Sequence, residues 1–310
     1  MSETISSALR RTLPPRSTQT DPFQLVELPE LMELSTGAGA TVALVDGPIA
    51  LDHPGLATVG IRFLNERSSG VCHQYDSVAC VHGTVIAGLL HATRADAARG
   101  ICPGAMLAVR QIFPESTTVV RGDGLPSATP GEVASAIHEV IDHGADIINL
   151  SVGLTMSSNR GDRVLEQALD RAARHDVIVV AAAGNEGQLG SSIITRHSWV
   201  VPVVACDHDG QILASSNLCT SIGRRGLVAP GHNVVSLDAR GGHAKYSGSS
   251  VAAAFVTGTF ALLRAAFASA NATDLRFAVL GNSAGRRSVS PPLLNAWTAY
   301  RALKLITLRN

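Results

Sequence analysis

Ser250 stands in the segment YSGSSVAAAFVTG, where a glycine-containing turn precedes a predicted long apolar helix. A hydroxyl at the start of a helix lies beside free backbone N–H groups and the positive end of the helix dipole, which would favour the formation of an oxyanion. Gly-Ser-Ser before a helix is also typical of an ordinary N-cap. Taken alone, this segment therefore favours a capping serine over a nucleophile.

Three further polar residues stand at the ends of predicted elements. Asp46 ends the apolar run TVALVD and precedes Gly-Pro, which by itself indicates a turn. His82 begins HGTVIAG, where the next two residues are expected to start a helix and leave the imidazole at its N-terminal end; a helix-boundary histidine is the alternative. Asn185, in AAAGNEG, follows a predicted strand and is alternatively a turn former. Reactive groups collect at such places in parallel α/β sheets.

Short continuous apolar runs, which predict strands covered on both faces, occur at 41–46, 145–152, 177–182 and 199–206. Segments of helical spacing lie between them: one after His82, one from a capping box at Thr129 to Gly144, and one over 162–175. Strands that alternate with helices predict an α/β fold with a parallel sheet and helices on both faces.

The simplest division of the chain is one domain over 22–310, preceded by a flexible segment, 1–21, that is polar and carries two adjacent prolines. Twenty-five basic residues balance 25 acidic ones, so charge suggests neither a nucleic acid nor an anionic membrane as a partner. The N-terminus lacks the apolar core of a secretory signal, and no later stretch is expected to span a bilayer. We therefore expect a cytoplasmic protein.

The five cysteines are odd in number and scattered, which favours reduced, mostly buried thiols over a disulfide framework. Two of them, Cys72 and Cys80, have histidines nearby but lack the paired spacing of a zinc site. The segment Asp207–Gly210 is more typical of a turn than of a cation site. We therefore expect no metal and no cofactor.

The chain resembles the subtilisin-like serine proteases, or subtilases, over about 38–300. The motifs that carry this resemblance are VALVDGPIALDHPGL, HGTVIAG, IINLSVG, AAAGNEG, VAPG, SGSSVAAAFVTG and PPLLNAWTAY, in this order. The order Asp, His, Ser is one of three known for the serine-protease triad. The resemblance implies a three-layer α/β/α fold with a mostly parallel central sheet.

The resemblance also implies roles for individual residues. Ser250 would be the nucleophile, His82 its general base, and Asp46 the partner that orients the imidazole. Asn185 would supply the oxyanion hole together with the backbone N–H of Ser250. We expect activity to fall as His82 protonates, within about a unit of pH 6.5. An extended substrate strand would bind at the edge formed by Ser151, Val152 and Gly153, and its primary pocket would be lined by Ala182, Ala183 and Gly184.

Three residues depart from the usual pattern of the family. Ser249 stands in place of threonine before the nucleophile, and Val85 in place of a second histidine. Ala254 stands where many subtilases carry a proline, which perturbs a helix by removing an N–H donor. A regular first turn would shift Ser250 slightly and change how an acyl-enzyme divides between water and an amine; neutral drift is the alternative.

A narrower resemblance connects LPELMELSTGAGATVALVDGPIALDHPGL with the cyanobactin-maturation proteases, a branch that cuts or cyclises ribosomally made precursor peptides. The function it implies is a serine endopeptidase that cleaves a precursor peptide, its only expected partner. The alternatives are a transpeptidase or macrocyclase of the same fold, and a catalytically silent peptide-binding scaffold. The sequence leaves the oligomeric state and the cleavage site open.

Overall fold

The computed structural model describes residues 20–64, 70–115, 127–154, 159–281 and 287–308, with only the backbone of 159–161. Seven strands form one sheet, in which every neighbouring pair is parallel. Their spatial order is β2 (Ile61–Phe63), β3 (Met106–Gln111), β1 (Thr41–Asp46), β5 (Ile147–Leu150), β7 (Ile178–Ala182), β8 (Val200–Cys206) and β9 (Leu227–Pro230). The four strands expected from the sequence are all present.

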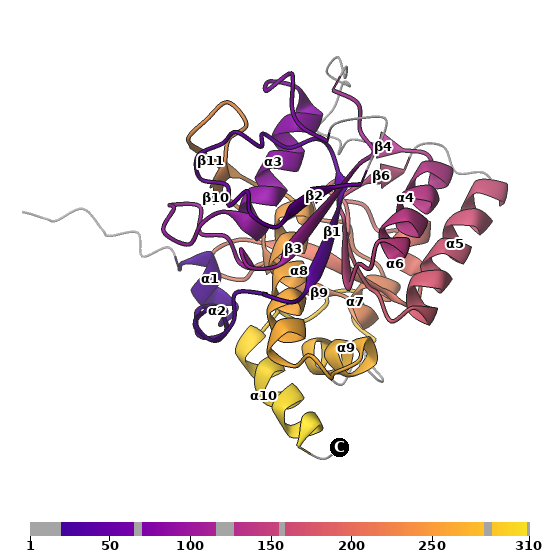
Figure 1. The fold of residues 1–310 in the computed structure, drawn as a ribbon. Coiled ribbons are helices and arrows are strands. Elements are labelled where there is room, and N and C mark those ends of the chain that lie inside the picture. Colours follow the sequence, from indigo (N-terminus) through magenta and orange to yellow (C-terminus); the bar gives the residue numbers. More distant parts are fainter. Residues whose placement is uncertain (1–19, 65–69, 116–126, 155–158, 282–286, 309–310) are drawn as a thin grey trace, which may run out of the picture.

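Helices cover both faces of this sheet (Figure 1). Their bounds are α1 (Pro22–Leu25), α2 (Pro29–Leu34), α3 (Val78–His91), α4 (Pro130–Asp142), α5 (Asn159–Arg174), α6 (Ile193–Arg196), α7 (Thr220–Arg225), α8 (Ser249–Ala266), α9 (Ala272–Leu280) and α10 (Ala296–Thr307). Helices α4 and α5 lie on one face of the sheet, and helices α3 and α8 lie on the other. This arrangement is the expected three-layer α/β/α fold.

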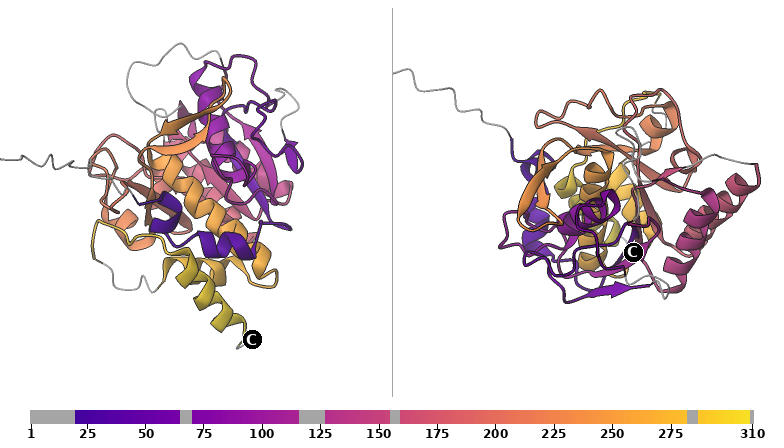
Figure 2. Two further views of the ribbon diagram at one scale, coloured as in Figure 1. Left: turned by 90° about the vertical axis from the view of Figure 1, so that its left-hand side faces the viewer. Right: turned by 90° about the horizontal axis from the view of Figure 1, so that it is seen from above.

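Two smaller strand pairs lie outside the main sheet. One is an antiparallel hairpin of β10 (Val234–Leu237) and β11 (His243–Tyr246). The other joins β4 (Ser127–Ala128) to β6 (Gly153–Leu154) in parallel. Figure 2 shows the hairpin, in orange, beside α3.

The alternation of side chains along β1 explains why the sheet has a core on each face. Val42 and Leu44 belong to the core that contains α3 and α8, whereas Ala43 and Val45 belong to the core that contains α4 and α5. Successive side chains of a strand point to opposite faces, so a strand covered twice must be apolar throughout. The continuous apolar run in the sequence is therefore a direct consequence of the two helical layers.

The capping signals around α4 are confirmed. Thr129 accepts a hydrogen bond from the backbone N–H of Glu132, whose carboxylate accepts one from the N–H of Thr129. Gly144 follows the helix with a φ of 79°, a left-handed conformation that favours glycine. These local contacts fix both ends of the helix.

The start of α3 was placed wrongly from the sequence. The helix begins at Val78, and its N-cap is Ser77, whose side chain accepts a hydrogen bond from the N–H of Cys80. His82 therefore lies in the second turn of α3 and not at its N-terminal end. The helix dipole at the N-terminus consequently contributes less to the charge environment of His82 than the sequence indicated.

Helix α8 corrects the expectation about apolar stretches. Its residues 249–266 are long and apolar enough to cross a membrane by length and composition, and 83% of them are buried inside the protein. The helix packs against β5, β7, β8 and β9, so its apolar character serves the core of the fold.

The cysteines also differ from the expectation of reduced thiols. Cys72 and Cys80 form a disulfide that ties the loop before α3 to the first turn of that helix. Cys102, Cys206 and Cys219 are free. The pairing was missed because the two sulfurs meet only once the loop folds back over the helix.

Two glycines allow α3 to approach the loop after β1 closely. A Cβ atom on Gly83 would lie 2.4 Å from the carbonyl oxygen of Pro48, and one on Gly47 would lie 2.0 Å from the carbonyl oxygen of Ala79. Real side chains do not tolerate such distances to backbone atoms, so neither position can carry a Cβ without separating the helix from the strand.

We expect Gly83→Ala to lower the free energy of unfolding by about 1–3 kcal/mol, because the added methyl group overlaps the backbone of the loop. Urea unfolding measures this change. Gly131→Ala is the matched control: Gly131 is an exposed residue of α4 whose Cβ would meet no atom within 4 Å. The close approach would be refuted if the two substitutions had the same effect.

Candidate active site

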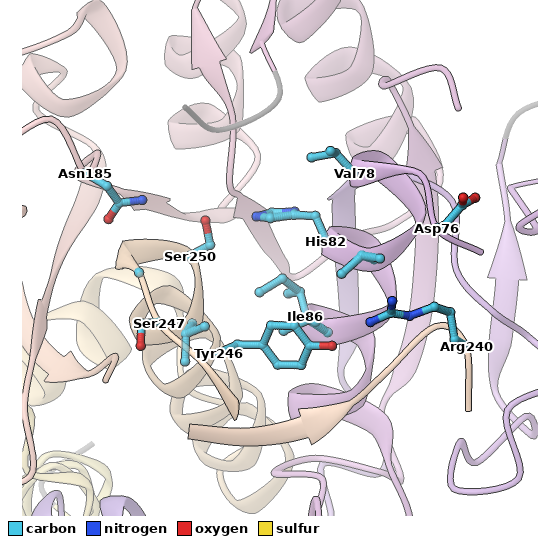
Figure 3. A pocket seen from close by; sticks show the side chains of 13 residues that line it. Asp76, Val78, His82, Ile86, Asn185, Arg240, Tyr246, Ser247 and Ser250 are labelled. Carbon is cyan, nitrogen blue, oxygen red and sulfur yellow. The ribbon is translucent and has the colours of Figure 1, made fainter. Parts of the chain in front are cut away.

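The four polar residues singled out in the sequence come together at one end of the sheet. Asp46 is the last residue of β1, Asn185 follows β7, His82 lies in α3, and Ser250 is the second residue of α8. His82, Asn185 and Ser250 line one cavity of about 370 Å³, into which their side chains project (Figure 3). Asp46 lies behind His82 and is fully buried.

A short hydrogen bond joins His82 to Asp46. The distance between Nδ1 of His82 and Oδ1 of Asp46 is 2.6 Å, and the backbone N–H of Gly47 donates to the same oxygen over 2.6 Å. Asp46 therefore has both roles that the sequence allowed. It stabilises the turn after β1, and it fixes the imidazole of His82. With the Nδ1 proton directed at the carboxylate, Nε2 is left as an acceptor.

The surroundings of His82 act on its pKa in opposite directions. Burial favours the neutral imidazole and lowers the pKa, whereas the charge of Asp46 and the hydrogen bond to it raise the pKa. The carboxylate prevails, and the pKa of His82 lies above its ordinary value of 6.5. The contact with Asp46 therefore stabilises the imidazolium that forms when His82 accepts a proton.

Ser250 is not the N-cap of α8. Gly248 holds that position, with a φ of 142° that favours glycine, and no side chain caps the helix. Oγ of Ser250 and Nε2 of His82 are both buried and have no hydrogen-bond partner among the described residues. A buried polar atom without a partner is costly, so two such atoms in one cavity indicate a function other than stability.

Ser249 fixes the orientation of Asn185. The backbone N–H of Ser249 donates to Oδ1 of Asn185 over 2.8 Å, which leaves the side-chain N–H₂ group free to donate elsewhere. Oγ of Ser249 accepts a hydrogen bond of 3.1 Å from the backbone N–H of Gly184. In the sequence, Ser249 is recognisable only as a hydroxyl that replaces threonine; its position next to Ser250 is the available signal for this second role.

A second cavity, of about 480 Å³, lies beside the first. It brings together five of the residues expected to bind substrate, namely Val152, Gly153, Ala182, Ala183 and Gly184. Ser151 is fully buried, accepts a hydrogen bond from Asn149 and does not line this cavity.

The expected open edge of the sheet is partly occupied. Gly153 belongs to β6 and is paired with Ser127 of β4. A peptide that pairs with Gly153 must therefore displace β4 or use the opposite edge of β6. The sequence could not indicate this pairing, because β4 is only two residues long.

The candidate cation sites also have structural explanations. Cys72, Cys80 and Glu115 form a group with the geometry of metal ligands, but the two sulfurs are bonded to each other. Oδ1 of Asp207 accepts hydrogen bonds from the N–H groups of Asp209 and Gln211, and this confirms the predicted turn.

We expect NMR titration of the imidazole resonances to give a pKa for His82 above 6.5 and a lower value in Asp46→Asn, since that substitution removes the charge that stabilises the imidazolium. His91 is an internal control. Burial lowers its pKa below 6.5, and it should titrate alike in both proteins. A His82 pKa that is insensitive to Asp46→Asn would contradict the coupling.

Known proteins share this fold and sequence pattern. The model of the subtilase family matches residues 37–296. The thermostable alkaline protease of Halalkalibacterium halodurans is 31% identical over 242 residues, which are 77% of this chain and 61% of that protein, so the chain spans less than two thirds of this relative.

Solved structures support the narrower resemblance. The patellamide maturation protease PatA is 25% identical, with a TM-score of 0.71 and coverage of 86% of this chain and 97% of that one. The PatG macrocyclase in complex with peptide has a TM-score of 0.76 at 17% identity, over 92% and 98% of the two chains, which is a likeness of fold. From its match over 37–296, the chain belongs to the subtilase family, the subtilisin-like serine proteases.

Proposed function

We propose that this subtilase is an endopeptidase that uses Ser250 as nucleophile, His82 as general base and acid, and Asp46 as the group that orients His82. One observation carries the proposal: Nδ1 of His82 bonds to Asp46 over 2.6 Å, while Nε2 shares a cavity with the unpaired hydroxyl of Ser250. An inert scaffold has no need of two buried polar atoms without partners.

The reaction divides into two acyl transfers. As Oγ of Ser250 attacks the scissile carbonyl carbon, its proton passes to Nε2 of His82, and Asp46 stabilises the imidazolium. The same proton then passes to the departing amine, which leaves an acyl-enzyme. In the second transfer His82 takes a proton from water as the water attacks the acyl carbon, and it returns that proton to Oγ of Ser250 as the acyl group leaves as a carboxylic acid. Since His82 must be neutral to accept the proton, activity should fall with acidification through a midpoint above 6.5.

The oxyanion formed in each transfer needs donors. We assign this role to the side-chain N–H₂ of Asn185 and the backbone N–H of Ser250. Asn185 suits it because Oδ1 is already bonded to Ser249, so the amide is held in place before substrate arrives. Donors fixed in advance require no reorganisation as charge develops.

Asn185→Ala should lower kcat by about 10²–10³, the cost of removing one oxyanion donor, which corresponds to about 3 kcal/mol of transition-state stabilisation. KM should change little, because the donor acts mainly on the tetrahedral state. Steady-state kinetics measure both constants. A loss confined to KM would mean that Asn185 binds the ground state instead.

The substrate we propose is a ribosomally made precursor peptide, cut at a specific site by a cytoplasmic enzyme. The likeness to the maturation protease PatA and the Asp-Gly-Pro segment at the end of β1 support this class. Acyl-side residues of the peptide would occupy the cavity lined by Ala182, Ala183 and Gly184.

Transfer of the acyl group to an amine is the second candidate reaction. Ala254 favours it, because α8 runs without interruption from Ser249 and the helix that carries Ser250 is regular through this position. Restoring a proline there tests this. If the ratio of hydrolysis to aminolysis is the same in Ala254→Pro as in the wild type, Ala254 does not favour transfer to an amine.

Two measurements test the proposed function. A fluorophosphonate probe should label the wild-type protein and leave Ser250→Ala unlabelled, since the probe needs an activated serine; equal labelling of both would refute the assignment. Incubation with peptides encoded near the gene, followed by mass spectrometry, should yield cut products. Linear, cyclic and uncut species then separate the protease from the macrocyclase and the scaffold.

A further inference from the structure

The cavity that holds Ser250 is separate from the cavity lined by Ala182, Ala183 and Gly184, which we call the acyl-side cavity. The two share no lining residue and lie on either side of the segment that joins Gly184 to Asn185. His82, which would give its proton to the departing amine, lines only the first cavity. Given the proposed function, the first cavity is therefore where the peptide segment on the C-terminal side of the scissile bond must leave.

This leaving-side cavity has an apolar wall and a polar wall. Its apolar wall consists of Val78, Val81, Val85 and Ile86 from α3 and Val251 from α8. Its polar wall comes from the β10–β11 hairpin, which contributes Arg240 and Tyr246. Figure 3 shows the guanidinium of Arg240 and the ring of Tyr246 beside Ile86.

Arg240 is held in place by its neighbours. Its Nε donates to Oδ1 of Asp238 and its Nη2 to Oδ2, each over 3.1 Å, and the hydroxyl of Tyr246 donates to Oδ2 over 3.2 Å. Asp238 is 11% exposed, and its hydrogen bonds with Arg240 lower its pKa to about 2. The pair is therefore charged near neutral pH.

One nitrogen of the Arg240 guanidinium, Nη1, remains free to donate hydrogen bonds. It takes no part in the contacts with Asp238, and no other described residue accepts a hydrogen bond from it. An arginine fixed through Nε and Nη2 offers the N–H groups of Nη1 in a set direction, at little entropic cost to a ligand.

The charges around Arg240 decide which acceptor suits it. Asp238 neutralises the guanidinium, and Asp76 on the rim of the same cavity adds a further negative charge that acts on Arg240. A carboxylate ligand would be repelled by these two groups, whereas a neutral carbonyl would not.

We propose that Arg240 is a substrate-binding residue that donates a hydrogen bond from Nη1 to a backbone carbonyl on the leaving side of the peptide, while an apolar side chain of that segment lies against Val85 and Ile86. The inference rests on the proposed function. It assigns the hairpin a part in choosing peptides by the residues that follow the cut.

Two substrates with one acyl segment test this assignment. Both carry the four residues that precede the cleavage site mapped by mass spectrometry; one ends in a p-nitroanilide, and the other continues with Leu-Gln-Gly-amide. Arg240→Ala should lower kcat/KM for the extended peptide about tenfold more than for the anilide, because only the peptide has leaving-side carbonyls. Arg301→Ala, a change of an exposed residue on α10, should leave both rates unaltered.

An equal loss for both substrates in Arg240→Ala, or no loss for either, would overturn the assignment. Should this variant unfold, Tyr246→Phe, which removes one of the hydrogen bonds that hold Asp238, must lower kcat/KM for the extended peptide more than for the anilide. A wild-type preference for Leu-Glu-Gly-amide over Leu-Gln-Gly-amide would also overturn it, because the acceptor would then be a carboxylate. If the wild type is not labelled by the phosphonate and cuts neither substrate, the proposed function itself has failed.

Discussion

The contact between helix α3 and the loop after β1 is the constraint on which the site depends. Asp46 belongs to the sheet and His82 to a helix, so a bond of 2.6 Å between them requires the two layers to meet with almost no side-chain volume in between. Gly47 and Gly83 supply that space, since a Cβ on either would overlap the opposite backbone. An ordinary helix–sheet separation would leave the carboxylate out of reach of the imidazole.

Burial and charge at this contact work against each other, and their balance makes the pair useful. Removing Asp46 from water strengthens its attraction for His82, because charges interact more strongly where water is excluded. The same burial penalises the imidazolium and so opposes the rise in the pKa of His82 that the charge of Asp46 and the hydrogen bond to it cause. A solvent-exposed pair would be screened and would neither orient the ring nor support a proton transfer.

The elements that the sequence predicted well are those dictated by local physics. β1, β7 and β8 are continuous apolar runs because both faces of the sheet are covered, and α4 is bounded by a capping box and a left-handed glycine. Asp46 and Asn185 were found because they end or follow such strands, and Ser250 because it lies in the first turn of a helix. His82 was found at an expected helix start, although it lies in the second turn of α3. Their common position at the carboxyl end of the parallel strands then follows from topology.

The features that could not be predicted from the sequence depend on how loops and short strands fold back on their neighbours. The Cys72–Cys80 disulfide and the pairing of β4 with β6 each join residues whose neighbours carry no shared pattern. The hairpin that holds Arg240 has short strands with little apolar alternation, and Asp238 fixes Arg240 only because β11 folds back to bring Tyr246 to the same carboxylate.

Helix α8 connects the core of the fold with the active site. Its apolar residues are buried against four strands, so the helix is held as part of the core and Ser250 at its start cannot drift relative to the sheet. The next link is polar: Ser249 joins the start of α8 to Asn185 and Gly184, which follow β7. A hydroxyl fixed by the core, a base fixed by the close approach of α3, and an amide fixed by Ser249 thus meet in one cavity. Small displacements matter at a reacting centre, and each of these groups is anchored to a different rigid element of the fold.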